Sequence, residues 1–200
     1  MAITKIKGTS SFTNLTKYDS FLAGNAAYSP AAFESIATIT ATGGETSLNF
    51  TSIPGTYASL QVRGISRDTD AGTGWNFGGI RVNNDTGSNY ASHFLRGNGS
   101  AVAASGSATV TTGNGILAIG NGSTAGIFGA AIFDLQDYAS TARYKTIRSF
   151  IGGDSNGAGL VYLTSSLWQS TSAITSIQIL PGATAFAAGS TFALYGIKGA

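Results

Sequence analysis

Residues 190–198 read S-T-F-A-L-Y-G-I-K, and this stretch decides the fold. Phe192, Leu194 and Gly196 alternate with a second set that includes Tyr195 and Ile197, so both faces of a strand would carry apolar groups. This pattern predicts a strand inside a sheet and not at its edge. The stretch lies two residues from the carboxyl terminus, so we expect it to insert between strands formed earlier in the chain and to close one domain.

A period-two pattern of apolar residues begins at Phe33 and runs to the end of the chain. Glycine-rich turns such as T-G-G-E separate the periodic segments, and no convincing long helix lies among them. We predict an all-β fold, a jelly-roll-like antiparallel β-sandwich over residues 31–200. A β-helix is less favoured because the chain has no internal repeat of fixed period. The predicted strands are 35–42, 47–53, 57–67, 75–83, 90–96, 115–120, 126–135, 144–152, 160–164, 173–180 and 190–197.

The stretch 97–115 is rich in Ser, Ala, Gly and Thr, and its composition fits two interpretations. Low complexity is typical of a loose loop. Small residues that tolerate extended backbone in 101–112 are equally compatible with a loose hairpin. The sequence does not choose between them.

Residues 1–30 form a separate arm with different spacing. The apolar residues within 12–22 have near-helical spacing, so we expect an extended arm with a short helical part that must dock on something to be stable. Pro30 separates it from the strands. The arm either packs on its own domain or anchors the protein to a partner. The candidate anchor residues are Lys5, Lys7, Phe12, Leu15, Tyr18, Phe21 and Leu22.

The chain has few charges and few reactive groups. Only 10% of its 200 residues are charged, 28 are glycine, none is cysteine, and the net charge is +2. This balance gives no electrostatic argument for nucleic acid or an anionic membrane, and no window has the eighteen or so apolar residues of a membrane span. The amino terminus lacks the apolar core of a signal peptide. A surface poor in charge is typical of proteins that bury much of their exterior in assemblies.

No catalytic constellation is visible. His93 is the only histidine and is interpreted as an ordinary strand residue. There is no G-x-S-x-G motif, and no pair of carboxylates is marked for glycoside hydrolysis. We expect a protein that is not an enzyme and has no cofactor.

Oxygen ligands near glycine-rich turns are the remaining candidates for a metal. Asp68, Asp70, Asp85 and Asp154 lie at three such turns and could contribute to a calcium site. The same residue types form hydrogen-bonded turns without metal, and no stretch matches the twelve-residue EF-hand loop, so the turn interpretation is favoured.

Aromatic and arginine side chains are the better candidates for binding. Trp75, Tyr90 and Trp168 lie at strand ends or beside turns, where such rings suit sugar stacking or protein interfaces, although core packing explains most aromatic residues of a sandwich. Arg63 and Arg67 are evenly spaced on one face of a predicted strand, opposite the core. Arginine on a flat sheet face favours pairing with carboxylates between or within subunits.

Five segments in order resemble a family of small tailed-bacteriophage virion proteins, frequent in phages of cyanobacteria and other aquatic hosts. The resemblance spans roughly 33–198, is weakest over 97–127 and does not include the first thirty residues. The segments are 57–68 (Y-A-S-L-Q-V-R-G-I-S-R-D), 82–90 (V-N-N-D-T-G-S-N-Y) leading into 95–100 (L-R-G-N-G-S), 137–148 (D-Y-A-S-T-A-R-Y-K-T-I-R), 166–178 (S-L-W-Q-S-T-S-A-I-T-S-I-Q) and 190–198.

The resemblance implies a β-sandwich of the phage particle that forms trimers and carries no known catalytic motif. We therefore expect a virion structural protein assembled in the host cytoplasm: a trimeric appendage of the tail or neck, or a capsid decoration protein, held by residues 1–30. Its partners would be its own copies and other phage structural proteins. The alternative is a carbohydrate-binding module that recognises host-surface glycan.

Overall fold

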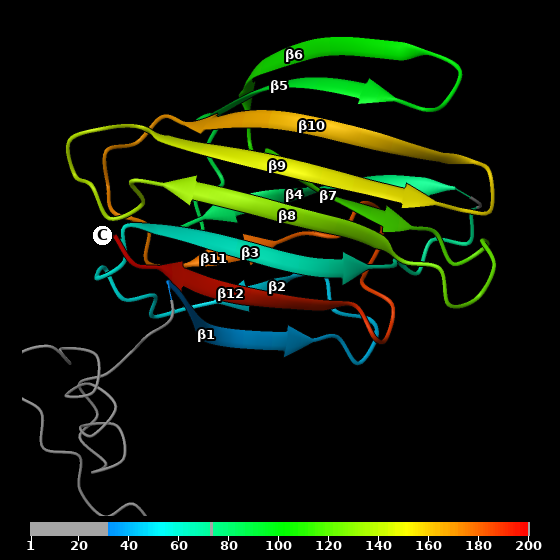
Figure 1. The fold of residues 1–200 in the computed structure, drawn as a ribbon, viewed down its shortest axis with the longest axis horizontal. Helices are drawn as coiled ribbons and strands as arrows, with labels where there is room; N and C mark the ends of the chain where they lie inside the picture. Colours follow the sequence, from blue (N-terminus) through cyan, green and yellow to red (C-terminus); the bar gives the residue numbers. More distant parts are fainter. Residues whose placement is uncertain (1–31, 73, 200) are drawn as a thin grey trace, which may run out of the picture. The chain divides into compact units, whose positions relative to one another are not determined.

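The computed structural model describes residues 32–72 and 74–199, which form an antiparallel β-sandwich (Figure 1). This confirms the all-β prediction. The predicted arm, residues 1–30 with its seven anchor candidates, lies outside the described residues. Within 32–72 and 74–199 there is no helix long and apolar enough to cross a membrane.

The larger sheet has eight antiparallel strands in the order β1-β12-β3-β8-β9-β10-β5-β6. Strands β8, β9 and β10 follow one another in the chain and are neighbours in the sheet, whereas β12 and β5 join the sheet from distant parts of the chain (Figure 1). The strands are β1 (Phe33–Thr40), β3 (Ser59–Ser66), β5 (Tyr90–Gly97), β6 (Val102–Val110), β8 (Gly129–Gln136), β9 (Lys145–Asp154), β10 (Gly159–Trp168) and β12 (Thr191–Ile197).

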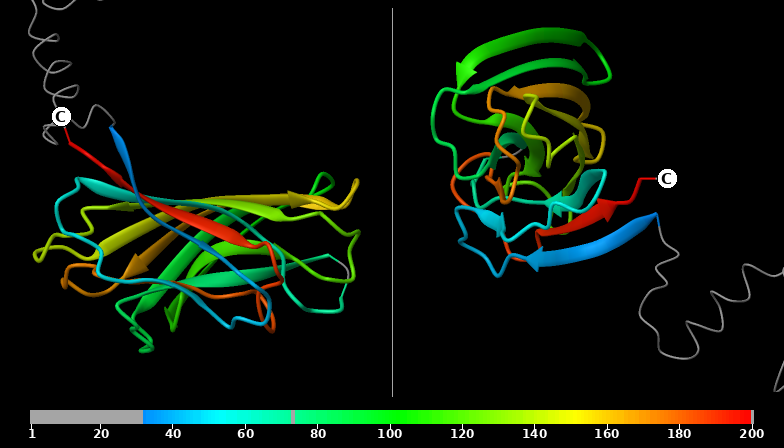
Figure 2. Two further views of the ribbon diagram at one scale, coloured as in Figure 1. Left: turned by 90° about the horizontal axis from the view of Figure 1, so that it is seen from below. Right: turned by 90° about the vertical axis from the view of Figure 1, so that its left-hand side faces the viewer.

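The smaller sheet has four antiparallel strands in the order β2-β11-β4-β7 and is stacked on one face of the larger sheet (Figure 2). Its strands are β2 (Leu48–Phe50), β4 (Trp75–Val82), β7 (Gly113–Ile119) and β11 (Ile177–Ile179). The core lies between the two sheets. Its fully buried side chains include Leu60, Val62, Phe133 and Leu135 from the larger sheet and Ile80, Val82, Ile116 and Ile177 from the smaller one.

The last strand lies inside the large sheet, as its sequence predicts. β12 is hydrogen-bonded to β1 on one side and to β3 on the other. Phe192 and Leu194 are fully buried, whereas the opposite face of the strand is only half-buried. Phe192 pairs with Gly64 of β3, where an added Cβ would overlap the Phe192 ring and lie 2.5 Å from the carbonyl oxygen of Thr191. The close approach of these two strands therefore requires glycine at position 64.

Each predicted strand corresponds to an observed one, with differences in length. The predicted strands 47–53 and 173–180 shrink to the three-residue β2 and β11, and the predicted strand 160–164 extends to Trp168. The undecided stretch 97–115 contains β6, which forms a hairpin with β5 and is exposed along almost its whole length. It is therefore neither a loop nor a hairpin within itself, because its pairing partner is the preceding strand.

Candidate functional site

Among the predicted binding residues, Arg67 has surroundings that differ most from those we expected. It lies one residue beyond the end of β3 and is only 6% exposed, so it does not share the outer face of the sheet with Arg63. Its guanidinium donates hydrogen bonds to the carbonyl oxygens of residues 121, 123, 124 and 127, at 2.7–3.0 Å. The planar fork of arginine suits this convergence of acceptors. Arg67 therefore holds the loop before β8 in place and is not available to a partner.

Asp68 and Asp70 lie together, as their spacing suggests, but they are held by protein donors. The side-chain amide of Asn76 donates to Asp68 Oδ2 at 2.9 Å and to Asp70 Oδ2 at 3.2 Å, and the backbone N–H of Asp70 donates to Asp68 Oδ1 at 3.2 Å. Asp68 is fully buried, and burial raises its pKa. This arrangement is that of a hydrogen-bonded turn.

Tyr90, Trp168 and Asp85 form one unit of two buried rings and a half-buried carboxylate. Tyr90 is fully buried and Trp168 is 3% exposed, so the prediction that they offer surface for glycan stacking is wrong. The indole Nε1 of Trp168 donates to Asp85 Oδ2 at 2.7 Å, and the Tyr90 hydroxyl accepts from the backbone N–H of Val82 at 3.0 Å. Burial raises the pKa of Tyr90 to about 12. Each ring places its polar tip on an internal partner, which allows the ring to enter the core.

The remaining candidates are scattered. Asp154 accepts a hydrogen bond from the backbone N–H of Gly157 at 2.8 Å, in the turn between β9 and β10. Trp75 is half-buried at the start of β4. Arg63 is exposed on the outer face of the large sheet, with its guanidinium 5.5 Å from the centre of the Phe33 ring. Among residues 32–72 and 74–199, no three His, Cys, Asp or Glu side chains converge as metal ligands would.

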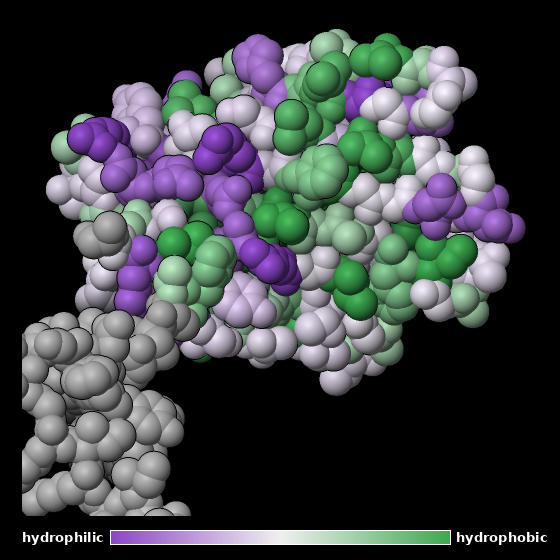
Figure 3. Space-filling view, viewed as in Figure 1, coloured by the Kyte–Doolittle hydropathy of each residue, from purple (hydrophilic) through white to green (hydrophobic). Residues whose placement is uncertain are grey.

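The outer face of the large sheet is the most distinctive surface among the described residues. Figure 3 shows hydrophobic side chains gathered over the middle of this face. They come from the six neighbouring strands β3, β8, β9, β10, β5 and β6. The cross-strand register places them in two adjoining rows. We call this surface the apolar stripe: Ile65, Leu95, Val102, Ile132, Phe150, Val161 and Leu163, which are 37–77% exposed.

The two rows of the apolar stripe follow directly from the pairing of the strands. The first row crosses the sheet from Arg63 to Ala104 through Ile132, Phe150, Leu163 and Leu95. The second row runs from Ile65 to Val102 through Ala130, Gly152, Val161 and Gly97. The first row therefore has large apolar side chains at its centre, and the second combines three large residues with three small ones.

A polar row borders the apolar stripe on one side. Gln61, Asp134, Arg148, Ser165 and His93 occupy the next outward-facing positions of the same strands. The amide of Gln61 donates to Asp134 Oδ1 at 2.7 Å, and Arg63 Nε donates to Gln61 Oε1 at 2.5 Å. The face thus combines an apolar centre with a polar border, which is the pattern of a protein interface.

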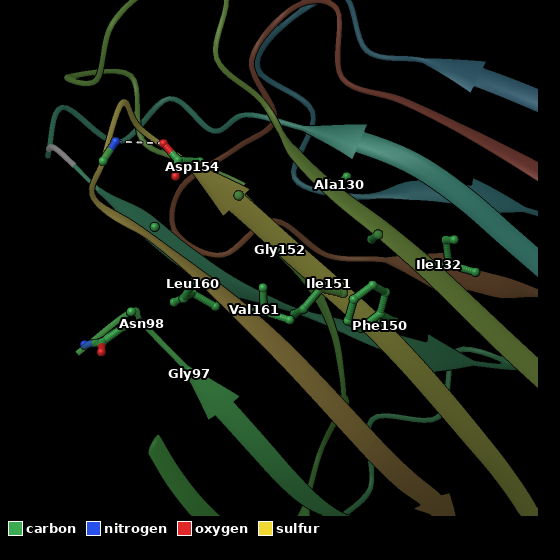
Figure 4. A pocket seen from close by; sticks show the side chains of 15 residues that line it. Gly97, Asn98, Ala130, Ile132, Phe150, Ile151, Gly152, Asp154, Leu160 and Val161 are labelled. Atoms are coloured by element: carbon green, nitrogen blue, oxygen red, sulfur yellow. Dashed lines mark hydrogen bonds between the residues drawn. The ribbon is translucent and has the colours of Figure 1, made fainter. Parts of the chain in front are cut away.

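A hollow of about 610 Å³ lies within this face (Figure 4). Gly97 and Asn98 lie on one side of it, and Phe150 and Ile132 on the other, with Val161 between them. Gly152 and Gly97 leave space because they carry no side chain, while Phe150 beside them is 54% exposed. The same surface therefore presents a projecting ring and a depression.

The apolar stripe is not among the sites predicted from the sequence. The sequence shows that its residues are apolar but not that they are exposed. Residues 160–168 have apolar groups in both alternating sets, so the exposed Val161 and Leu163 look like core residues. The polar Thr164 and Ser166 lie in the buried set, so they point away from the correct assignment and no signal within this strand identifies the exposed face. Recognition of the stripe also needs the register of six strands, which no single segment contains.

Comparisons of the chain with protein-family models, with curated proteins and with solved structures find no match.

Proposed function

We propose that this chain is a bacteriophage virion structural protein: a trimeric jelly-roll-like appendage, either a fibre or spike of the tail or neck or a capsid decoration protein, that docks on the particle through residues 1–30. The observation that carries the proposal is the apolar stripe on the outer face of the large sheet. A monomer rarely leaves so continuous an apolar surface in water, whereas a subunit of an assembly buries it. The resemblance of five ordered segments to phage virion proteins supports the same class.

The chemistry of the described side chains also favours assembly over catalysis. The carboxylates of Asp68, Asp70 and Asp85 are engaged by internal donors, and His93 lies on the exposed polar row. Arg67 is occupied by backbone carbonyl oxygens. We therefore propose a protein that is not an enzyme and has no cofactor. It works through the shape and apolar character of its surface.

Deletion of residues 2–30 tests the docking part of the proposal. The truncated chain should fold, because the strands of both sheets begin at Phe33 or later. It should fail to join particles when it is supplied in a host infected by a phage that lacks the full-length protein. Western blotting of purified particles measures incorporation, and normal incorporation of the truncated chain would show that residues 1–30 are not the anchor.

The mass of the purified protein in solution tests trimer formation. Light scattering should give about three times the 20.2 kDa of the chain. A single-chain mass at high concentration would count against self-association and leave docking on another phage protein intact.

The alternative, a module that binds host-surface glycan, has weaker support. Two of its three aromatic candidates, Tyr90 and Trp168, are buried, and only Trp75 is partly accessible. Adsorption of phage carrying Trp75→Ala and a glycan array with purified protein measure this function. Specific glycan binding that Trp75→Ala abolishes would establish it.

A further inference from the structure

We propose that the apolar stripe is the contact between copies of this chain, with the β3–β8 half of one copy's outer face packed against the β5–β6 half of the next copy. The copies would be related by an axis that runs parallel to the strands, in front of β9 and β10. This inference rests on the self-association in the proposed function and assigns it a surface and a pairing of rows.

The size of the apolar stripe suits a subunit interface. A large apolar side chain has about 150–250 Å² of surface, so seven side chains that are 37–77% exposed offer on the order of 700 Å². The largest apolar patch on a typical monomer is about 300–600 Å². A stable interface buries about 800 Å² from each partner. The stripe and its polar border together reach this size for each copy, divided between the contacts with its two neighbours.

A second copy is the occupant because the two halves of the face complement each other in size. An axis parallel to the strands keeps each row opposite the same row and reverses the strand order. It therefore places Ile132 opposite Leu95, and Phe150 opposite Leu163, along the first row. Along the second row it places Val161 opposite Gly152, so a projecting side chain meets the hollow left by a glycine.

The charges of the polar row fit the same pairing. Reversal of the strand order brings Asp134 of β8 opposite His93 of β5, so an acidic side chain meets a basic or neutral one. Arg148 of β9 comes opposite the uncharged Ser165 of β10. No two charged side chains of the same sign face each other along this row. A strongly charged partner would find little to pair with across the apolar stripe, and a second copy requires no such charges.

A pair of engineered cysteines tests the row pairing directly, because the chain contains no cysteine of its own. Ile132→Cys and Leu95→Cys lie three strands apart within one copy, about 14 Å at the usual strand spacing, which is too far for a disulfide. Between copies, the proposed pairing brings them together. The double variant should therefore form covalent oligomers under mild oxidation, up to trimers on a nonreducing gel.

The single variants are matched controls, since neither residue faces itself across the proposed axis. Ile132→Cys alone and Leu95→Cys alone should stay as single chains on the same gel. Both positions face outward, at 37% and 51% exposure, and circular dichroism should show all three variants folded. A double variant that is trimeric by light scattering but forms no disulfide would overturn the proposed surface and leave the trimer intact. A wild-type chain that is monomeric at high concentration would overturn this inference without touching docking through residues 1–30.

Polar substitution gives an independent readout on folded protein. Phe150→Glu should dissociate the oligomer, whereas Thr146→Glu should not, although Thr146 is exposed on the same face of the same strand. Mass by light scattering measures both. Equal masses for the two variants and the wild type would contradict the proposed contact.

Discussion

At the scale of single residues, the polar ends of buried side chains form hydrogen bonds that connect distant parts of this sandwich. Arg67 reaches from the end of β3 to the loop before β8, and Trp168 at the end of β10 reaches Asp85 in the turn after β4. Each link satisfies groups that would be costly to bury alone. These side chains therefore fix loops in place, although their residue types suggested binding to partners.

Arg67→Lys should destabilise the fold by about 2–4 kcal/mol, because one ammonium group cannot replace a fork that reaches four carbonyl oxygens. Hydrogen exchange should become faster in residues 121–127. The same change at the exposed Arg63 should stay within about 0.5 kcal/mol. Urea unfolding measures both, and equal effects at the two positions would show that Arg67 is not the loop's anchor.

Trp168→Phe should destabilise the fold in a pH-dependent way. The indole hydrogen bond is the main cause that lowers the pKa of Asp85 below its ordinary value of 3.8. A lowered folded pKa means that the bond stabilises the fold above pH 3.8 and that this contribution is lost as the pH falls through the folded pKa.

The free energy of unfolding should therefore differ between Trp168→Phe and the wild type by about 1–3 kcal/mol at pH 7, and the difference should shrink below pH 3.8. Trp75→Phe is the control, since its indole is not bonded to Asp85 and its effect should not follow the titration of that carboxyl group. A Trp168→Phe effect that stays constant from pH 7 to pH 2 would contradict the assignment.

At the scale of elements, the sequence predicts well where strands lie in the chain. It predicts less well where each strand ends and which of its side chains are buried. Alternation alone locates β12, because both of its faces are apolar and it lies between β1 and β3. It does not locate the end of β3, so it predicts Arg67 on the strand face, although Arg67 lies one residue beyond the strand. Burial of Tyr90 and Trp168 depends on partners from other segments, which periodicity within one segment does not contain.

β6 shows a different limit of the sequence. Its residues are mostly small and none is charged, so nothing in 102–110 indicates whether it is paired. Its pairing with β5 is decided by the connection to that strand, and its outer edge has no partner strand among the described residues. The absence of Lys and Pro from this edge also leaves it open to further pairing, a feature that most natural edge strands avoid.

Removal of β12 should prevent folding. A chain that ends at Gly189 loses a strand hydrogen-bonded on both sides and two fully buried side chains, Phe192 and Leu194. β1 would then lose its only neighbour in the large sheet. The truncated chain should show no cooperative thermal transition, whereas a chain that lacks only residues 199–200 should melt like the wild type. A cooperative transition in the shorter chain would mean that β12 is dispensable.

At the scale of the whole molecule, the sandwich has few charges, carboxylates held by internal donors and an apolar outer face, and these features support our proposal that it is a subunit of a larger assembly. The fold class could be predicted from alternation and turn residues, because both are local signals. The apolar stripe could not be predicted, because it exists only after the register of six strands is set. The proposed virion role joins this surface to a resemblance that covers the sandwich and not the arm.

Electron cryomicroscopy of the intact phage particle tests the central claim most directly. The account predicts a density for the sandwich, repeated about an axis parallel to its strands, with the outer faces of the large sheets turned toward one another. A purified particle that lacks this protein, by imaging and by mass spectrometry of its proteins, would contradict the claim that the chain is a structural component of the virion.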